Sequence, residues 1–131
     1  MIVHVSSDLM AASGLSSEAR SRGVPIKLVA NTQAVVKLLT EEQVDLLVVD
    51  LQTSNLKLDE LVGKVRSTAD EVAHVSLPLI VVYAQHVMTD LIERAKSLNV
   101  DIVMTRGQFS QQTADLVNRV CEKDVLEEPS S

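Results

Sequence analysis

The chain has 131 residues, of which 46% are apolar and 23% charged, and its net charge is -6. This length is typical of one domain that buries about 70% of the surface of its unfolded chain. The single cysteine cannot form an internal disulfide, and no set of Cys and His residues has zinc-ligand spacing. An acidic chain with 2% aromatic residues lacks the positive surface and the stacking rings needed to bind nucleic acid directly. We therefore expect a globular domain of the reducing cytoplasm.

The sequence contains no segment that predicts a membrane location. Its first residues have no basic start before an apolar stretch, and every apolar run is much shorter than the ~20 residues that cross a bilayer. We expect neither a signal peptide nor contact with a membrane.

Short β-branched runs alternate along the chain with longer segments whose apolar residues recur at helical spacing. The predicted strands are Ile2–Val5, Ile26–Ala30, Asp45–Val49, Leu79–Tyr83 and Ile102–Met104. The predicted helices are Leu9–Arg22, Thr32–Glu42, Leu58–Ser67, Thr89–Leu98 and Gln111–Lys123. Five such units predict an α/β fold over residues 1–123, a single doubly wound, five-stranded parallel sheet of the flavodoxin-like type. Residues 124–131 predict a flexible acidic tail.

Local breaks support these boundaries. Gly23 and Pro25 separate the first helix from the second strand, and either Asn31 or Thr32 is a candidate cap for the second helix. Asp8 stands where an aspartate would cap the first helix, and Asn99 is a candidate stop for the fourth.

Ligands of an open parallel sheet bind beyond the carboxyl ends of its strands, so the residues that end or follow each strand are the candidate site. There are five such places along the chain. They hold Ser6, Ser7 and Asp8 after the first strand, Asn31 and Thr32 after the second, Asp50 after the third, Tyr83 and Ala84 at the end of the fourth, and Thr105 and Arg106 after the fifth. We expect them to lie close together.

The segment VDLLVVDLQ, residues 44–52, resembles the third strand of the receiver domains of two-component response regulators. The segments LPLIVVYA, 77–84, and NVDIVMTRGQF, 99–109, resemble the fourth and fifth strands of the same family and the turns after them. The resemblance covers the chain from Ile2 to about Lys123. It implies a (βα)5 fold and a signalling role, and it makes Asp50 the candidate phosphoacceptor.

Receivers hold Mg²⁺ on two acidic residues after the first strand, because this small, hard cation prefers carboxylate oxygens. Those positions fall here on Ser6 and Ser7, with Asp8 one step later. A hydroxyl is a much poorer ligand than a carboxylate. We therefore predict no firmly held cofactor and only weak binding of Mg²⁺, through Asp50 with help from Asp8.

Two further positions also depart from the family. Tyr83 replaces the small hydroxyl residue that follows the phosphoryl group inward on activation, and it is too large for the same shift. Arg106 replaces the lysine after the fifth strand. It keeps the charge, although a planar guanidinium does not substitute for an ammonium, and it could pair with Asp50 and fill the pocket without any phosphate.

These departures favour a degenerate receiver that signals by protein contact, with impaired or absent Mg²⁺-dependent phosphorylation. By resemblance its partner would be a histidine kinase or an output protein. The partner or homodimer surface would be the fourth helix, fifth strand and fifth helix, 89–123, with Tyr83 beside it. Two alternatives stay open. One is a working receiver phosphorylated on Asp50 by a histidine kinase, and the other is a small nucleotide or flavin binder with its phosphate on the first helix N-terminus.

The histidines and the cysteine of the chain do not indicate a further site. His4, His74 and His86 have no neighbours at metal-ligand spacing, so we expect them to be structural or exposed. Cys121 is predicted to be a half-buried packing residue. The sequence contains neither a Ser-His-Asp order nor a GxSxG turn, and we predict that the chain is not an enzyme.

Overall fold

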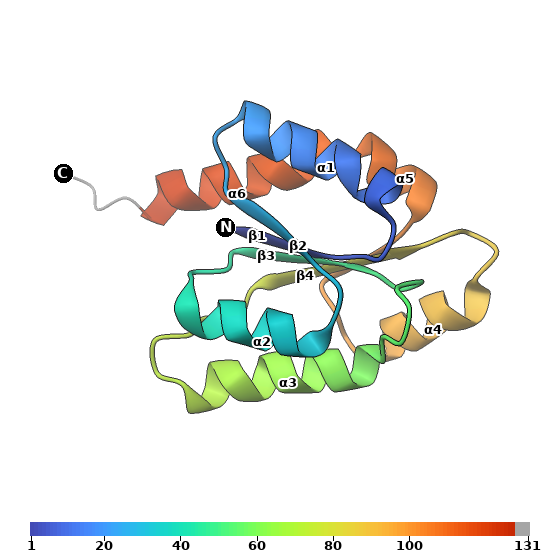
Figure 1. Ribbon diagram of the computed structural model, residues 1–131, viewed down its shortest axis with the longest axis horizontal. Helices are drawn as coiled ribbons and strands as arrows, with labels where there is room; N and C mark the ends of the chain where they lie inside the picture. The colour runs from blue at the N-terminus through green and yellow to red at the C-terminus, as the bar shows by residue number, and fades with distance from the viewer. Residues whose placement is uncertain (128–131) are drawn as a thin grey trace.

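The computed structural model describes residues 1–127, with side chains described as far as Glu122, and it has three layers (Figure 1). A central sheet lies between two layers of helices. In chain order the elements are β1 Ile2–Val5, α1 Leu9–Ser21, β2 Ile26–Val29, α2 Thr32–Glu41, β3 Leu46–Asp50, α3 Leu58–Glu71, β4 Leu79–Ala84, α4 Thr89–Ser97, β5 Ile102–Thr105, α5 Arg106–Gln111 and α6 Thr113–Glu127. No helix of this described part is long and apolar enough to cross a membrane.

The five strands are parallel and lie in the order β2-β1-β3-β4-β5. In register, Val5 lies opposite Val29 of β2 and Val49 of β3, and Asp50 lies opposite Tyr83 of β4. The direction of winding reverses between β1 and β3, which is where a sheet of this order opens a crevice. The predicted doubly wound, flavodoxin-like sheet is confirmed.

The two faces of the sheet bury different side chains, because successive residues of a strand point to opposite faces. Helices α2, α3 and α4 cover one face, and their buried core contains only Val, Leu, Ile and Ala side chains. We call this the aliphatic layer. Helices α1, α5 and α6 cover the other face (Figure 1), where Tyr83 and Phe109 join the core and His4 contacts both rings. We call this the aromatic layer.

The predicted caps are confirmed, and they fix where the helices begin. The Asp8 carboxylate accepts hydrogen bonds from the backbone N–H groups of Met10 and Ala11 at the start of α1. Asn31 caps α2 through the N–H of Ala34. Gly23 adopts a left-handed φ of 70° just after α1, a conformation that glycine accepts without steric cost.

The largest difference from the predicted elements is α5, an extra six-residue helix where a turn was expected. The Thr105 hydroxyl accepts from the N–H of Gln108, and the Gln108 side chain accepts from the N–H of Thr105. This reciprocal capping box nucleates the helix directly after β5. At the other end, α6 continues to Glu127 instead of ending at Lys123. The rest of the predicted acidic tail, 128–131, lies outside the described residues.

Candidate functional site

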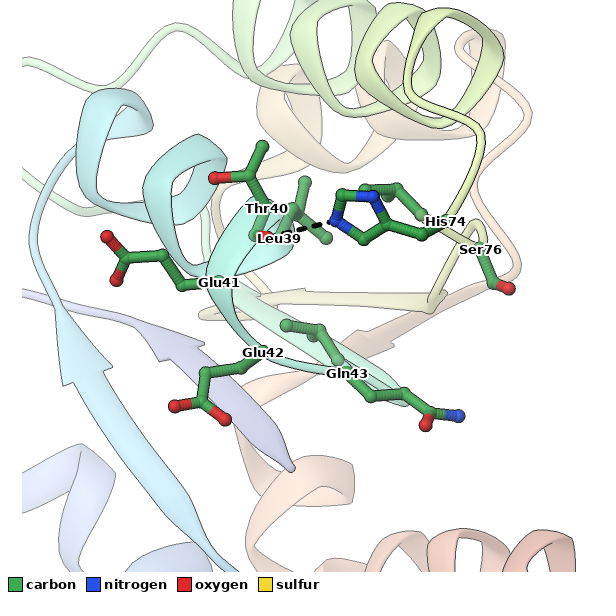
Figure 2. Close-up of a pocket in the computed structure, with 9 residues that line it drawn as sticks. Leu39, Thr40, Glu41, Glu42, Gln43, His74 and Ser76 are labelled. Atoms are coloured by element: carbon green, nitrogen blue, oxygen red, sulfur yellow. Dashed lines mark hydrogen bonds between the residues drawn. The ribbon is translucent and has the colours of Figure 1, made fainter.

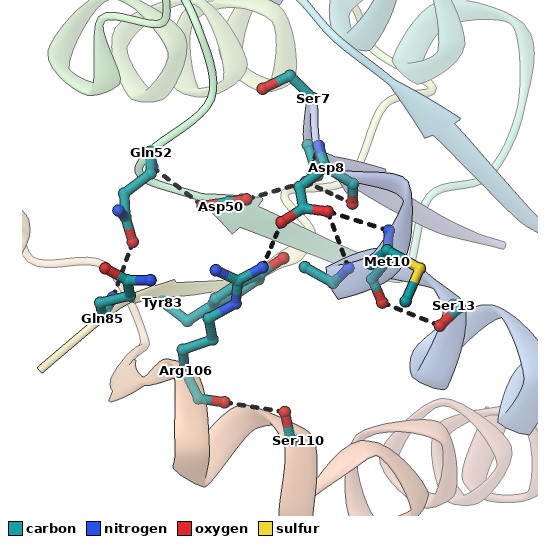
Figure 3. Close-up of polar contacts among 12 residues, drawn as sticks. Ser7, Asp8, Met10, Ser13, Asp50, Gln52, Tyr83, Gln85, Arg106 and Ser110 are labelled. Atoms are coloured by element: carbon teal, nitrogen blue, oxygen red, sulfur yellow. Dashed lines mark hydrogen bonds and ion pairs between the residues drawn. The ribbon is translucent and has the colours of Figure 1, made fainter.

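The carboxyl ends of β1, β3, β4 and β5 bring most of the predicted site residues together (Figure 3). We call this group the Asp50 cluster; its members are Ser6, Asp8, Asp50, Tyr83 and Arg106. Ser7 follows β1 as predicted, but its hydroxyl lies toward the loop after β3 and accepts a hydrogen bond from the N–H of Ser54 at 3.3 Å. Ser7 therefore holds that loop and does not contact Asp50.

Asp50 ends β3 and is 5% exposed. Its Oδ2 accepts a hydrogen bond from the Ser6 hydroxyl at 2.9 Å, and its Oδ1 accepts one from the N–H of Gln52 at 3.0 Å. Its backbone carbonyl accepts from the Thr53 hydroxyl at 2.6 Å. Both carboxylate oxygens therefore have donors supplied by the chain itself, which compensates for their removal from water.

Arg106 pairs with Asp8 and not with Asp50, so the expected ion pair is wrong. The reason is the capping of two helices. Asp8 is held at the start of α1 by its cap hydrogen bonds, and Arg106 is placed opposite it because α5 begins at this residue. The guanidinium bond and the N–H of Ala11 hold the pKa of Asp8 below its usual value, and the same bond raises the pKa of Arg106. Figure 3 shows the Arg106 side chain extending from the start of α5 to meet Asp8.

Tyr83 is fully buried in the aromatic layer, with no exposed surface. Its ring stacks on Phe109 with centroids 4.0 Å apart, and its hydroxyl lies 2.8 Å from His4 Nε2 in a hydrogen bond. Burial and the nearby charge of Asp50 raise its pKa, and a hydrogen bond with Ser6 offsets part of this rise. Tyr83 therefore belongs to the core. It lies next to Met104 of β5, but it has no exposed ring to offer a partner or on which a flavin could stack.

His4 extends the cluster inward, away from solvent. It is 1% exposed, and its Nδ1 has no hydrogen-bond partner among the described residues. Burial lowers its pKa from 6.5 to about 4, because the charged imidazolium is costly in a core. The expectation that His4 is structural is confirmed. Its link to Tyr83 was missed, although β1 and β4 place both side chains on the same face of the sheet.

Two glutamines were also missed by the sequence analysis. The Gln52 side chain accepts a hydrogen bond from the N–H of Gln85 at 2.9 Å, which ties the loop after β3 to the loop after β4 (Figure 3). Both glutamines follow strands that end at the cluster, and this position in the sequence could have identified them as neighbours of Asp50. With the bonds of Ser7 and Thr53, this contact fixes the loops around Asp50.

The cluster does not fit the ligand preferences of Mg²⁺. Ser6 and Ser7 supply hydroxyls where carboxylates are needed, and Asp8 is committed to its cap and to Arg106. Within the described residues, no three His, Cys, Asp or Glu side chains gather in a way that could hold a metal ion. Asp50 is therefore the one residue of the cluster whose carboxylate is not paired with a cationic side chain.

A separate hollow of about 300 Å³ lies at the opposite end of the sheet, between the end of α2 and the loop before β4 (Figure 2). Glu41 and Glu42 line it on one side. His74 lies on the other and donates a hydrogen bond from Nε2 to the carbonyl oxygen of Thr40 at 3.1 Å. None of the Asp50 cluster reaches this hollow, and it has no part in the site.

No family model and no curated protein matches this sequence. Solved structures match it over most of its length. The chemotaxis response regulator CheY4 of Vibrio cholerae is 13% identical with a TM-score of 0.68, covering 91% of this chain and 96% of that chain. The signal receiver domain of a signal transduction histidine kinase from Syntrophus aciditrophicus is 16% identical with a TM-score of 0.70, covering 99% and 94%.

A third match is a chain of the Saccharomyces cerevisiae co-crystal structure of the histidine phosphotransfer protein Ypd1 with the receiver domain of the response regulator Ssk1. It is 17% identical with a TM-score of 0.70, and the match covers 91% of this chain and 89% of that chain. At such identities the likeness establishes the fold and carries no chemistry. The chain has the fold of response-regulator receiver domains.

Proposed function

We propose that this chain is a receiver-like signalling domain that acts by binding another protein and does not depend on Mg²⁺-assisted phosphorylation of Asp50. The observation that carries this proposal is that both carboxylate oxygens of Asp50 already accept hydrogen bonds from the chain itself. One carboxylate oxygen accepts a hydrogen bond from the Ser6 hydroxyl and the other from the N–H of Gln52, while Arg106, the cationic member of the cluster, is paired with Asp8. A phosphoryl group and a metal would have to displace these bonds.

Tyr83 supports the same reading. In the receivers that this chain resembles, a small hydroxyl residue moves inward when the aspartate is phosphorylated. Tyr83 is already fully inside, stacked on Phe109 and hydrogen-bonded to His4. Its ring has no free volume to enter, because protein cores are packed as densely as organic crystals. The domain would therefore rest in one conformation and act as a constitutive docking module.

Its partner in this proposal is a protein of a signalling pathway, either a histidine kinase or an output protein. The receiver domain of Ssk1 in the yeast structure is bound to the phosphotransfer protein Ypd1. By resemblance, the expected partner or homodimer surface lies on α4, β5 and α6.

The second candidate is a working receiver phosphorylated on Asp50. It is favoured by the position of Asp50 at the carboxyl end of β3, beside the point where the sheet reverses its winding. In this reading the Asp8 and Arg106 pair would open to admit the phosphoryl group.

Intact mass and melting temperature separate the two. The protein is incubated with Mg²⁺ and acetyl phosphate, or with beryllofluoride, beside Asp50→Asn and the exposed control Asp59→Asn. We expect no added mass and no change in melting temperature in any of the three proteins. An added phosphoryl mass, or stabilisation seen in the wild type and Asp59→Asn and abolished in Asp50→Asn, would establish the working receiver instead, since a ligand that binds only the native state raises its stability.

A further inference from the structure

The strand β2 forms an open edge of the sheet. It pairs with β1 on one side, and no other described strand pairs with it (Figure 1). The outward backbone N–H and C=O groups of residues 26–29 are therefore not used by the sheet. An open edge of this kind is a template on which an additional strand can form main-chain hydrogen bonds.

A groove runs along this edge, between β2 and α1, with a volume of about 440 Å³. The groove has this space because α1 presents mostly small side chains, alanine and serine, toward β2. The lining residues are Leu9, Ala12, Ser13, Ser16, Ser17 and Arg20 of α1 with Ile26 and Leu28 of β2. Leu9 follows directly on Asp8, so one end of the groove lies beside the Asp50 cluster.

Part of the exposed apolar surface of the described chain lines the groove. The exposed large hydrophobic side chains are Leu9, Met10, Leu28, Leu77 and Val87, and of these Leu9 and Leu28 line the groove. Leu9 is 73% exposed and Leu28 is 37% exposed. By contrast, Leu91 and Ile92 of α4 pack against the aliphatic core. Contiguous exposed apolar residues of this kind mark interaction sites more often than scattered ones do.

The charged side chains of the groove lining and of β2 are both basic. Arg20 stands at one end of the groove and Lys27 lies on β2 itself, and no acidic side chain lines the groove. Lys27 points to the opposite face of the sheet from Ile26 and Leu28, because side chains alternate along a strand. In a chain of net charge -6, this local positive charge selects for an acidic segment.

We infer that the α1 and β2 groove is a docking site for an extended segment of a partner protein, in which apolar and acidic residues alternate. The segment adds to the sheet beside β2. Its apolar side chains enter the groove against Leu28 and Leu9, and its acidic side chains lie on the other face beside Lys27. The inference rests on the proposed protein-binding function, and it places one of the partner-binding surfaces on α1 and β2.

A second copy of this chain is a poorer occupant. Antiparallel pairing of two β2 strands about a two-fold axis would bring the two Lys27 side chains close together on one face, and like charges across a strand pair are destabilising. Two chains of the same net charge also repel each other.

Selection from a random twelve-residue peptide library on the immobilised full chain tests the inference. We expect enrichment of sequences with alternating apolar and acidic residues. A labelled peptide of the enriched sequence should bind at least tenfold more weakly to Lys27→Glu and Leu28→Glu, and equally to the matched control Lys64→Glu on α3. Its binding should weaken with added salt, and it should shift the amide resonances of residues 26–29.

Circular dichroism serves as the control for folding. We expect the three variants to be folded, because all three side chains are exposed. Enriched peptides without the alternation, a complete lack of enrichment, shifts confined to α4 and β5, or dimerisation of the chain through β2 would each overturn the inference. None of these outcomes bears on the phosphorylation of Asp50. The peptide-binding experiment therefore tests the groove, and the phosphorylation experiment separately tests the proposed function.

Discussion

The aliphatic layer closes its face of the sheet with apolar side chains, whereas the aromatic layer closes the opposite face with the only tyrosine, the only phenylalanine and a buried histidine. Both layers exclude water. Only the aromatic layer is continuous with the Asp50 cluster, because Tyr83 belongs to both and is hydrogen-bonded to His4 in the core. The difference indicates that the aliphatic layer serves stability, while the aromatic layer also holds the site in its closed arrangement.

The largest expected effect comes from Phe109→Ala, which removes the ring stacked on Tyr83. We expect a loss of about 3–5 kcal/mol in the free energy of unfolding, from lost burial and from the cavity left behind. Denaturant unfolding followed by far-UV circular dichroism measures it. Because the chain has no tryptophan, the fluorescence of the native protein reports Tyr83 alone, and it should change in this variant.

Leu61→Ala is the matched control in the aliphatic layer, where Leu61 of α3 is fully buried. It should cost about 2–5 kcal/mol as well. The native fluorescence of Tyr83 should stay as in the wild type. A change of equal size in both variants would contradict the separation of the two layers.

Acidification should destabilise the protein through His4. Its pKa is about 4 in the folded chain and 6.5 ordinarily, so below pH 6.5 the unfolded chain binds a proton that the folded chain does not. The free energy of unfolding should then fall by about 1.4 kcal/mol per pH unit, and by about 3 kcal/mol in all between pH 6.5 and 4. Urea unfolding at several pH values measures this slope.

Measurements between pH 6.5 and 5 keep the His4 contribution apart from that of Asp8. The pKa of Asp8 is lowered by Arg106, so its contribution is lost in more acidic solution. In His4→Gln the slope should be smaller over this interval. An unchanged slope would show that another group titrates there.

Tyr83→Phe isolates the polar part of the aromatic layer. The ring and its stacking on Phe109 remain, but His4 Nε2 loses its hydrogen-bond partner inside the core. We expect a loss of about 1–3 kcal/mol, the usual cost of an unsatisfied buried polar group. Thermal unfolding followed by far-UV circular dichroism is suitable, since this variant has no tyrosine signal. Wild-type stability would mean that the hydroxyl contributes nothing to the layer.

The smallest expected effect is a gain of metal binding in the double variant Ser6→Asp and Ser7→Asp. The carboxylate added at position 6, beside Asp50, should lower the melting temperature without metal, because like charges crowd a buried site. Mg²⁺ at ten times its dissociation constant should then restore about 1.4 kcal/mol. Calorimetry with and without Mg²⁺ measures both changes. Adding Asp50→Asn should remove the response, and a wild-type protein that responds equally would refute the poor fit to Mg²⁺.

Much of the architecture was predictable from the sequence. Strands β3 and β4 contain the continuous apolar runs LLVV and LIVVY, which are typical of interior parallel strands, and the caps Asp8 and Asn31 mark where helices begin. The run IVM in β5 favours an interior strand as well, but β5 lies at the edge of the sheet. Parallel strands have their carboxyl ends at the same edge of the sheet, and this rule predicted that four polar residues lie close together: Ser6, Asp50, Tyr83 and Arg106. The helix α5 was also within reach, because Thr105 and Gln108 have capping-box spacing.

Pairing within the cluster was not predictable, because it depends on contacts between residues far apart in the chain. The sequence by itself determined the order of elements and the edge at which the polar residues gather, since both depend on local pattern and strand parity. Only the tertiary structure decided that Arg106 pairs with Asp8, that Tyr83 turns inward to His4 and Phe109, and that the groove beside β2 stays open. Each of these is fixed by the packing of helices against the sheet, where small differences in position select one partner over another.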